Sequence, residues 1–205
     1  NASNLPAQGP TVGCSTWVEM MLTPEQKVTL KVEILADPAA NAFYSIGDLS
    51  GLAGYYNALT SPAFYGYRTA IPANEVFDGV LWANFTPSDT VPTDTALNNA
   101  IFQSRQLACQ TKQMNLQTML TGRDAIDCSK ANIRAGLQDA LTNIPSGANG
   151  ATRSAGWTTV RDGVLARLSN RLEKLFATGG NGSTPATAAT LVVEGDLSTA
   201  DLVGL

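Results

Sequence analysis

Two pairs of acidic residues are the side chains of this chain best suited to acid–base chemistry. Glu75 lies three residues before Asp78, and Asp124 lies three residues before Asp127. Two carboxylates can act as general acid and general base, as in glycoside hydrolysis, when they face each other across a cleft. Each pair, however, lies beside a predicted helix end, where acidic residues commonly cap the helix or favour its dipole. We therefore interpret both pairs as structural.

Histidine is absent from the chain, which removes several catalytic arrangements at once. Ser-His-Asp and Cys-His catalysis and the H-E-x-x-H zinc site all require it. The three cysteines, Cys14, Cys109 and Cys128, include no C-x-x-C pair for a structural zinc ion. They favour reduced thiols in a protein folded in the cytoplasm, with a Cys109–Cys128 disulfide as the alternative. We assign no catalytic, cofactor-binding or metal-ligating residue, and we expect a protein without cofactor that is not an enzyme.

The glycine-rich segment 179–182 does not predict a phosphate site. Glycines that bind phosphate precede a helix and present its N-terminus to the anion, whereas these glycines come after a predicted helix. No Lys-Ser or Lys-Thr pair comes after them either. The segment is typical of a helix end and a linker.

The composition bears on partners more than on chemistry. Of the 205 residues, 44% are hydrophobic and only 15% are charged, where roughly a quarter is usual. This favours a homo-oligomer that covers part of its surface with other subunits, and a charge-poor monomer is the alternative. The net charge of −4 argues against specific nucleic-acid binding, and no apolar segment approaches the roughly 20 residues of a membrane helix.

The elements that must position these residues begin with a helix over 24–36. Thr23 is a favourable cap, proline stands at the first helical position, and Gln26 stands three residues after the cap. Residues 28–34 alternate apolar and polar side chains, which favours a strand instead. We prefer the helix because Asp37 precedes a proline, which is a natural helix end.

Further along, a short helix is expected at 48–58, capped by Asp48 or Ser50. The segment 60–95 is rich in proline and is expected to be irregular, with extended pieces at 63–69 and 80–85 and a helical turn at 73–77. Its aromatic residues are expected to pack onto the core rather than bind a ligand. They are Phe64, Tyr65, Tyr67, Phe77, Trp82 and Phe85.

A long polar helix is expected over 95–120, and a second helix is expected to start at a Ser129 cap and reach Ile144. A flexible linker is expected at 145–156, where small residues predominate. The buried side of the long helix is expected to comprise Leu97, Ile101, Leu107, Leu116, Met119 and Leu120.

The segment 157–180 has the clearest helical pattern and ends at Gly179 and Gly180. Its expected buried stripe comprises Trp157, Val160, Val164, Leu168, Leu172, Leu175 and Phe176. Outside that stripe lie Arg161, Arg167, Arg171 and Lys174. Because acidic residues interrupt these cations, we interpret them as a solvated or subunit-facing side.

A short strand at 190–194 and a last helix capped by Ser198 complete the chain. The sequence therefore predicts a mainly α protein, an irregular helical domain over 21–205 with a few short β-strands. Residues 1–20 are expected to be an extended N-terminal arm, which either hangs free or lies along a neighbouring subunit.

Three short segments resemble a family of uncharacterised structural or assembly proteins encoded by tailed bacteriophages and prophages. They are Met21-Leu22-Thr23-Pro24-Glu25-Gln26, Asn132-Ile133-Arg134-Ala135-Gly136-Leu137 and Arg171-Leu172-Glu173-Lys174-Leu175-Phe176-Ala177-Thr178-Gly179. Thr184-Pro185-Ala186-Thr187 and Val193-Glu194-Gly195-Asp196-Leu197-Ser198 also fit this resemblance. The motifs are short and none is catalytic, and residues 1–20 depart from the family pattern.

The resemblance implies a virion protein made in the host cytoplasm that contacts portal, tail or capsid subunits. Our leading hypothesis is a non-enzymatic component of the head–tail neck or tail that assembles as a ring. A capsid decoration protein is the nearest alternative within this class. The alternative from another class is a virion-associated carbohydrate-binding or hydrolytic protein that uses Glu75, Asp78 and the aromatic residues of 64–85.

Overall fold

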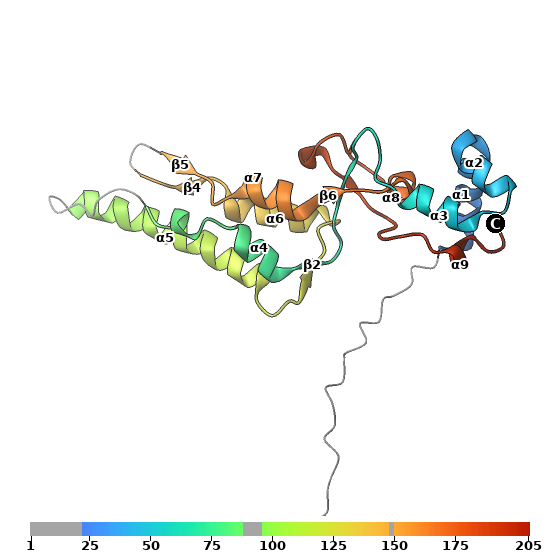
Figure 1. Cartoon of the computed structure of the whole chain (residues 1–205). Helices are drawn as coiled ribbons and strands as arrows, with labels where there is room; N and C mark the ends of the chain where they lie inside the picture. Colours follow the sequence, from blue (N-terminus) through green and yellow to red (C-terminus); the bar gives the residue numbers. More distant parts are fainter. Residues whose placement is uncertain (1–21, 88–95, 148–149) are drawn as a thin grey trace, which may run out of the picture.

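The computed structural model describes residues 22–87, 96–147 and 150–205, and the predicted arm at 1–20 lies outside them. The described chain is mainly α with a few short strands, as the sequence predicts. It is elongated, with α4 to α7 toward one end and α1 to α3, α8 and α9 toward the other (Figure 1). Its buried hydrophobic residues accordingly form two core clusters.

The smaller core lies among five helices. These are α1 (Pro24–Ala36), α2 (Pro38–Ser45), α3 (Leu49–Asn57), α8 (Arg171–Phe176) and α9 (Thr199–Leu202). The caps that the sequence predicts for α1, α3 and α9 are confirmed, because Thr23, Asp48 and Ser198 each accept a backbone N–H of their helix. Gln26 completes the capping box of α1, which explains why helix prevails over the alternating pattern.

The larger core lies among helices that come mainly from the middle of the chain. They are α4 (Ala73–Gly79), the 3₁₀ turn η1 (Trp82–Phe85), α5 (Ala96–Leu120), α6 (Ala131–Leu141) and α7 (Trp157–Val160). Two small antiparallel ladders accompany them, β2 (Ile71–Pro72) with β3 (Ala125–Ile126) and β4 (Ile144–Pro145) with β5 (Thr152–Arg153). A further 3₁₀ turn, η3, lies at Pro185–Thr187.

A three-stranded sheet connects the two halves. Its central strand, β1 (Tyr65–Tyr67), pairs antiparallel with β6 (Ala166–Leu168) and parallel with β7 (Ala189–Thr190). The predicted strand at 190–194 is therefore shorter than expected and begins one residue earlier. Since β6 leads directly into α8, this sheet fixes α8 relative to the larger core.

The expected continuous helix over 157–180 is wrong. After α7 the chain forms a π-helical turn, η2 (Arg161–Leu165), and then strand β6. Asn170 caps the new helix α8 and forms a capping box with Glu173. The helix predicted over 157–180 is therefore interrupted before Arg171. Leu168 consequently lies on the strand, 40% exposed, and is not part of a buried stripe.

Other expected boundaries also shift. Residues 82–85 form the turn η1 instead of an extended piece. The helix expected from Ser129 begins at Ala131, because the Ser129 backbone and hydroxyl both donate to Asp127 and make a turn. The predicted linker 145–156 contains part of the β4–β5 hairpin within its described residues.

The long helix α5 is confirmed, but its buried side is only partly as expected. Leu116 and Leu120 are buried, whereas Ile101 and Leu107 are 47% and 65% exposed. The side chain of Leu97 lies outside the described residues. A helix that covers the core with only part of one face leaves these aliphatic groups at the surface.

No disulfide joins Cys109 and Cys128, which are both buried, and Cys14 lies outside the described residues. Burial raises the pKa of the Cys128 thiol to about 11, so this thiol stays protonated near neutral pH. The interpretation as reduced thiols is confirmed for these two residues.

Candidate functional site

Helix α1 has apolar side chains on two opposite faces. Leu30 and Ile34 are fully buried in the smaller core. Val28, Val32 and Leu35 are 65%, 64% and 54% exposed, and their spacing of four and three residues places them along one stripe. We call this stripe the α1 outer face. The two faces together account for the alternating pattern at 28–34.

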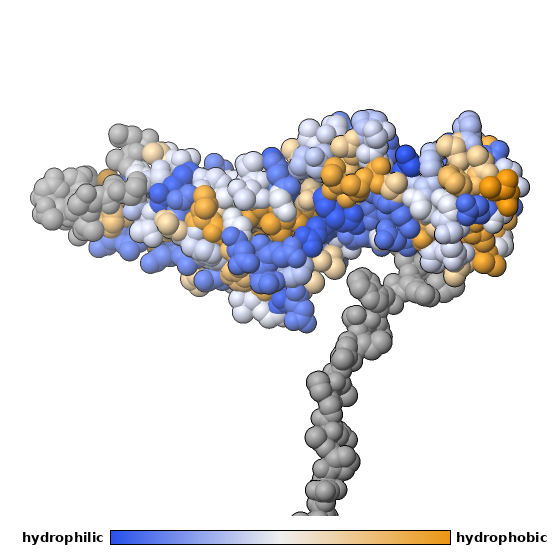
Figure 2. Space-filling view, in the orientation of Figure 1, coloured by the Kyte–Doolittle hydropathy of each residue, from blue (hydrophilic) through white to orange (hydrophobic). Residues whose placement is uncertain are grey.

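Hydrophobic residues gather elsewhere at this end of the molecule as well, over the region around α2 and the C-terminus (Figure 2). Ile46, after α2, is 77% exposed and Val203, after α9, is 65% exposed. Isolated exposed aliphatic residues are ordinary, but a contiguous group of them is typical of an interaction surface.

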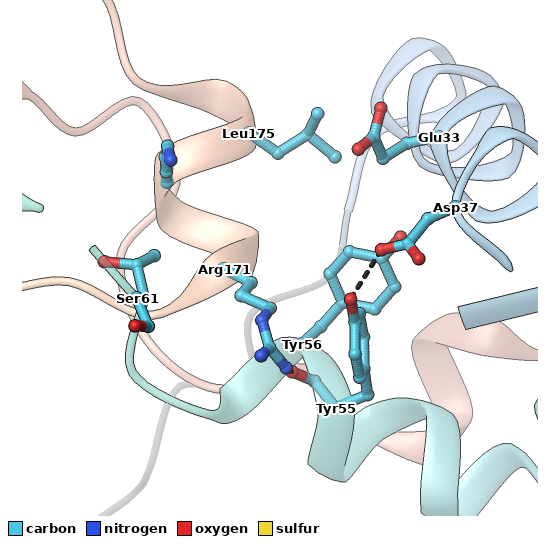
Figure 3. A pocket seen from close by; sticks show the side chains of 9 residues that line it. Glu33, Asp37, Tyr55, Tyr56, Ser61, Arg171 and Leu175 are labelled. Carbon is cyan, nitrogen blue, oxygen red and sulfur yellow. Dashed lines mark hydrogen bonds between the residues drawn. The ribbon is translucent and has the colours of Figure 1, made fainter. Parts of the chain in front are cut away.

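A pocket of about 410 Å³ lies between the C-terminal part of α1, the end of α3 and helix α8 (Figure 3). We call it the α1–α3–α8 pocket. Its lining residues are Glu33, Asp37, Tyr55, Tyr56, Thr60, Ser61, Arg171, Lys174 and Leu175. The sequence did not indicate this site, because its parts come from segments that are distant in the chain.

Three of these residues hold one another in place. The Tyr55 hydroxyl donates to Asp37 at 2.5 Å, and Asp37 also accepts the Ala39 backbone N–H at 2.9 Å as the cap of α2. Arg171 donates to the Tyr55 carbonyl at 2.9 Å and lies over the Tyr55 ring, 4.0 Å from its centroid. These contacts make one ordered wall of the pocket.

The hydrogen bond between Tyr55 and Asp37 shifts both groups. It lowers the pKa of Asp37, and it raises the pKa of Tyr55, with burial acting in the same direction on the tyrosine. Asp37 is therefore ionised and Tyr55 protonated throughout the neutral range.

We expect Tyr55→Phe to raise the pKa of Asp37 toward its ordinary value, because the carboxylate loses its hydroxyl donor. Since the folded-state pKa lies below the ordinary 3.8, ionised Asp37 favours the folded state above that pH. This contribution disappears as the pH falls through the lowered pKa. Carboxyl ¹³C NMR titration measures the pKa directly, and an unchanged pKa in the variant would contradict the assignment.

The Tyr56 hydroxyl, in contrast, lacks such a partner in the described structure. Tyr56 is 2% exposed, and its hydroxyl has no hydrogen-bond partner among the described residues. Burial, and to a smaller extent the nearby carboxylates of Glu33 and Asp37, raise the pKa of Tyr56. The hydroxyl therefore keeps its proton and is able both to donate and to accept.

The acidic pairs that the sequence indicated have other roles. Arg68 donates to Glu75 at 2.6 Å and lowers the pKa of that carboxyl. Burial acts to raise the pKa of Asp127, but the hydrogen bonds from the Ser129 hydroxyl and N–H, together with the nearby Lys130, outweigh it, so this pKa is lowered. Neither Glu75 nor Asp78 lines the α1–α3–α8 pocket.

The aromatic residues after β2 pack against the larger core, as the sequence indicated. The rings of Phe77 and Trp82 stack at 5.5 Å, and Phe85 lies 5.9 Å from Trp82. The Trp82 indole N–H donates to the Phe77 carbonyl. The rings thus support one another instead of lining an open platform.

The cations expected on a solvated face mostly bind groups of this same chain. Arg161 pairs with Asp162 at 2.5 Å, and Arg167 pairs with the buried Glu173 at 2.6 Å. Arg171 is held by the carbonyl and ring of Tyr55. Arg167 and Arg171 are therefore held by contacts within the fold, and both stay partly exposed.

Comparisons with known proteins add no relative. No family model, curated protein or solved structure matches this chain. The relation to phage proteins therefore remains a prediction based on the short motifs. No described helix combines the length and apolarity needed to cross a membrane. The part of the chain that the structure describes also gathers no group of three or more acidic or cysteine residues able to hold a metal ion.

Proposed function

We propose that this chain is a non-enzymatic structural protein of a tailed-bacteriophage particle, located in the head–tail neck or the tail. In this proposal it is made in the host cytoplasm and acts in the virion through contacts with its own copies and with portal, tail or capsid subunits. The short sequence motifs suggest the phage origin. The single observation that supports the mode of action best is the α1 outer face.

The α1 outer face has the properties of a prepared contact surface. Val28, Val32 and Leu35 project from one helix whose opposite face is anchored in the core by Leu30 and Ile34. A partner that covers the stripe would remove apolar area from water without reordering the helix, so little conformational entropy is lost on binding. The low charge content of 15% fits a surface of this kind.

A second exposed apolar stripe lies on α5, in the other half of the elongated molecule (Figure 1). Leu107 and Met114, seven residues apart on the same helix face, are 65% and 64% exposed. A hollow of about 420 Å³ lies beside Met114 and Thr118. Two different surfaces at separate places are what a head-to-tail contact requires, and such contacts form a ring when the rotation between copies closes. We therefore propose that the α1 outer face of one copy contacts α5 of the next.

Sedimentation velocity of the purified chain tests this contact. We expect a closed ring of about six to twelve copies, and we expect Val32→Glu and Leu107→Glu each to shift it to monomers. Each substitution places a carboxylate in an apolar contact but leaves the folded monomer intact, since both positions are exposed.

Val192→Glu is the matched control, because Val192 is also exposed, at 58%, but lies outside both stripes. It is expected to keep the ring. A wild-type chain that stays monomeric at every concentration, or a control variant that dissociates as fully as Val32→Glu, would contradict the proposed contact.

The alternatives have less support among the described residues. A capsid decoration protein would use the same apolar surfaces but would be present in hundreds of copies. A carbohydrate-binding or hydrolytic role has less support, because Glu75 is bound by Arg68 and Phe77, Trp82 and Phe85 pack onto the larger core.

A further inference from the structure

The α1–α3–α8 pocket contains a buried hydroxyl that nothing in the described structure satisfies. Tyr56 is 2% exposed and lines the pocket, yet its hydroxyl has no hydrogen-bond partner among residues 22–87, 96–147 and 150–205. The rings of Tyr55 and Tyr56 both rise from α3 toward Asp37 (Figure 3), but only Tyr55 binds that carboxylate. Buried polar atoms normally have a partner, so an unsatisfied one in a pocket wall indicates a place for a ligand atom.

Opposite charges stand on different walls of the same pocket. Glu33 comes from α1 and Lys174 from α8, and both residues are exposed at the pocket surface. Within the described ranges the Glu33 carboxylate forms no ion pair, and the Lys174 ammonium contacts only the Phe64 ring, 5.7 Å from its centroid. Each charge is therefore available to a ligand.

The other two charged residues of the pocket follow the same arrangement, with negative charge on one wall and positive charge on the other. Asp37 lies on the Glu33 side and Arg171 on the same helix as Lys174. A ligand that is only anionic would meet the two carboxylates, and a ligand that is only cationic would meet the two cations. A ligand with one group of each sign satisfies both walls.

We propose that this pocket binds a small zwitterion of the size of an amino acid or dipeptide. Its ammonium group would face Glu33, its carboxylate would face Lys174, and a polar atom between them would bond to the Tyr56 hydroxyl. Leu175 supplies an apolar contact for the ligand's carbon atoms. The volume of about 410 Å³ is within the usual range of small-molecule sites, roughly 300–1,000 Å³.

Ligand binding in this pocket does not depend on the proposed function. The pocket uses none of Val28, Val32 and Leu35, so a monomeric Val32→Glu protein is expected to bind the ligand as the wild type does. Loss of ring assembly and loss of ligand binding are separate results.

The direct test is a titration of the full chain with glycyl-leucine and with free amino acids, monitored by ¹H–¹⁵N NMR. We expect saturable shifts at the pocket residues for the zwitterions. N-acetyl-glycyl-leucine lacks the ammonium charge and glycyl-leucinamide lacks the carboxylate. Each is expected to bind at least about tenfold more weakly. Absence of pocket shifts with all zwitterions at millimolar concentration, or equal binding of the capped peptides, would overturn the proposal.

Three variants assign the contacts. Tyr56→Phe, Glu33→Gln and Lys174→Gln are each expected to weaken binding about tenfold or more, as for a lost bond to a charged group. Lys31→Gln and Glu25→Gln remove equivalent charges from exposed positions of α1 outside the pocket and are expected to leave binding unchanged.

Tyr56→Phe also separates a binding role from a structural one. Because the hydroxyl has no hydrogen-bond partner in the described part of the chain, its removal is expected to leave the melting temperature unchanged or higher. A variant that binds glycyl-leucine as tightly as the wild type would remove Tyr56 from the site. A variant that melts well below the wild type would mean that the hydroxyl is satisfied within the fold, which also contradicts the proposal.

Discussion

Replacement of Glu173 by alanine is expected to destabilise the protein by about 3–5 kcal/mol, which is the usual loss when one partner of a buried ion pair is removed. Glu173 is 1% exposed and accepts two hydrogen bonds from Arg167, at 2.9 and 2.6 Å. It also accepts the backbone N–H groups of Asn170 and Gly195. Alanine removes the acceptor of both backbone N–H groups and of two Arg167 hydrogen bonds at the junction of β6, α8 and the C-terminal segment.

Arg167 would keep only one carboxylate, that of Glu194 at 3.1 Å, which also binds the backbone and hydroxyl of Thr69. Urea unfolding measures the loss. Asp139→Asn is the control, because Asp139 pairs with Lys112 at an exposed position, where a change within about 0.5 kcal/mol is usual. A Glu173→Ala protein less than about 1 kcal/mol below the wild type would show that the cluster does not stabilise the fold.

Leu172→Asp is expected to prevent stable folding, with a loss of more than about 4 kcal/mol. Leu172 is fully buried in the smaller core, where a carboxylate would have neither water nor a cation as partner. Leu168→Asp is expected to cost less than about 1 kcal/mol, because Leu168 is 40% exposed on the edge strand β6. The sequence pattern alone places both leucines in one buried helical stripe. The two aspartate variants therefore distinguish a continuous helix over 157–180 from the strand β6 followed by the helix α8.

Leu172→Ala keeps this comparison measurable if the aspartate variant does not fold. It is expected to lose about 2–5 kcal/mol in urea unfolding, as core leucines do. A Leu168→Asp protein that is as unstable as Leu172→Ala would indicate a continuous helix and would contradict the strand β6.

The sequence predicts the helix starts well because capping is local chemistry. Thr23, Asp48 and Ser198 each satisfy backbone N–H groups within three residues, so their spacing in the sequence is sufficient evidence. In the same way, the aromatic residues near Trp82 could be assigned to the core from their type alone.

The segment 157–180 could not be predicted because its structure depends on a distant partner. Ala166–Leu168 forms a strand only because β1, about a hundred residues earlier, supplies the backbone groups for pairing. Asn170 is the local signal that could have indicated the interruption, since it stands three residues before Glu173 as in a capping box.

The α1–α3–α8 pocket was not predicted for a similar reason. The spacing of Glu33 and Asp37 at the end of α1 could be read from the sequence. Their opposition to Arg171 and Lys174 comes from the packing of α1 on α2, of α2 on α3 and of α3 on α8. The orphan hydroxyl of Tyr56 likewise has no sequence signature, because it depends on which groups fail to reach it.

The most direct test of the proposed function is the number of copies of this chain in purified phage particles. Quantitative mass spectrometry against the major capsid protein counts these copies. We expect about six to twelve copies per particle, as in one closed ring at the neck or tail. Hundreds of copies would place it on the capsid surface as a decoration protein. Particles that form without containing the chain would contradict the proposal that it is a structural component of the virion.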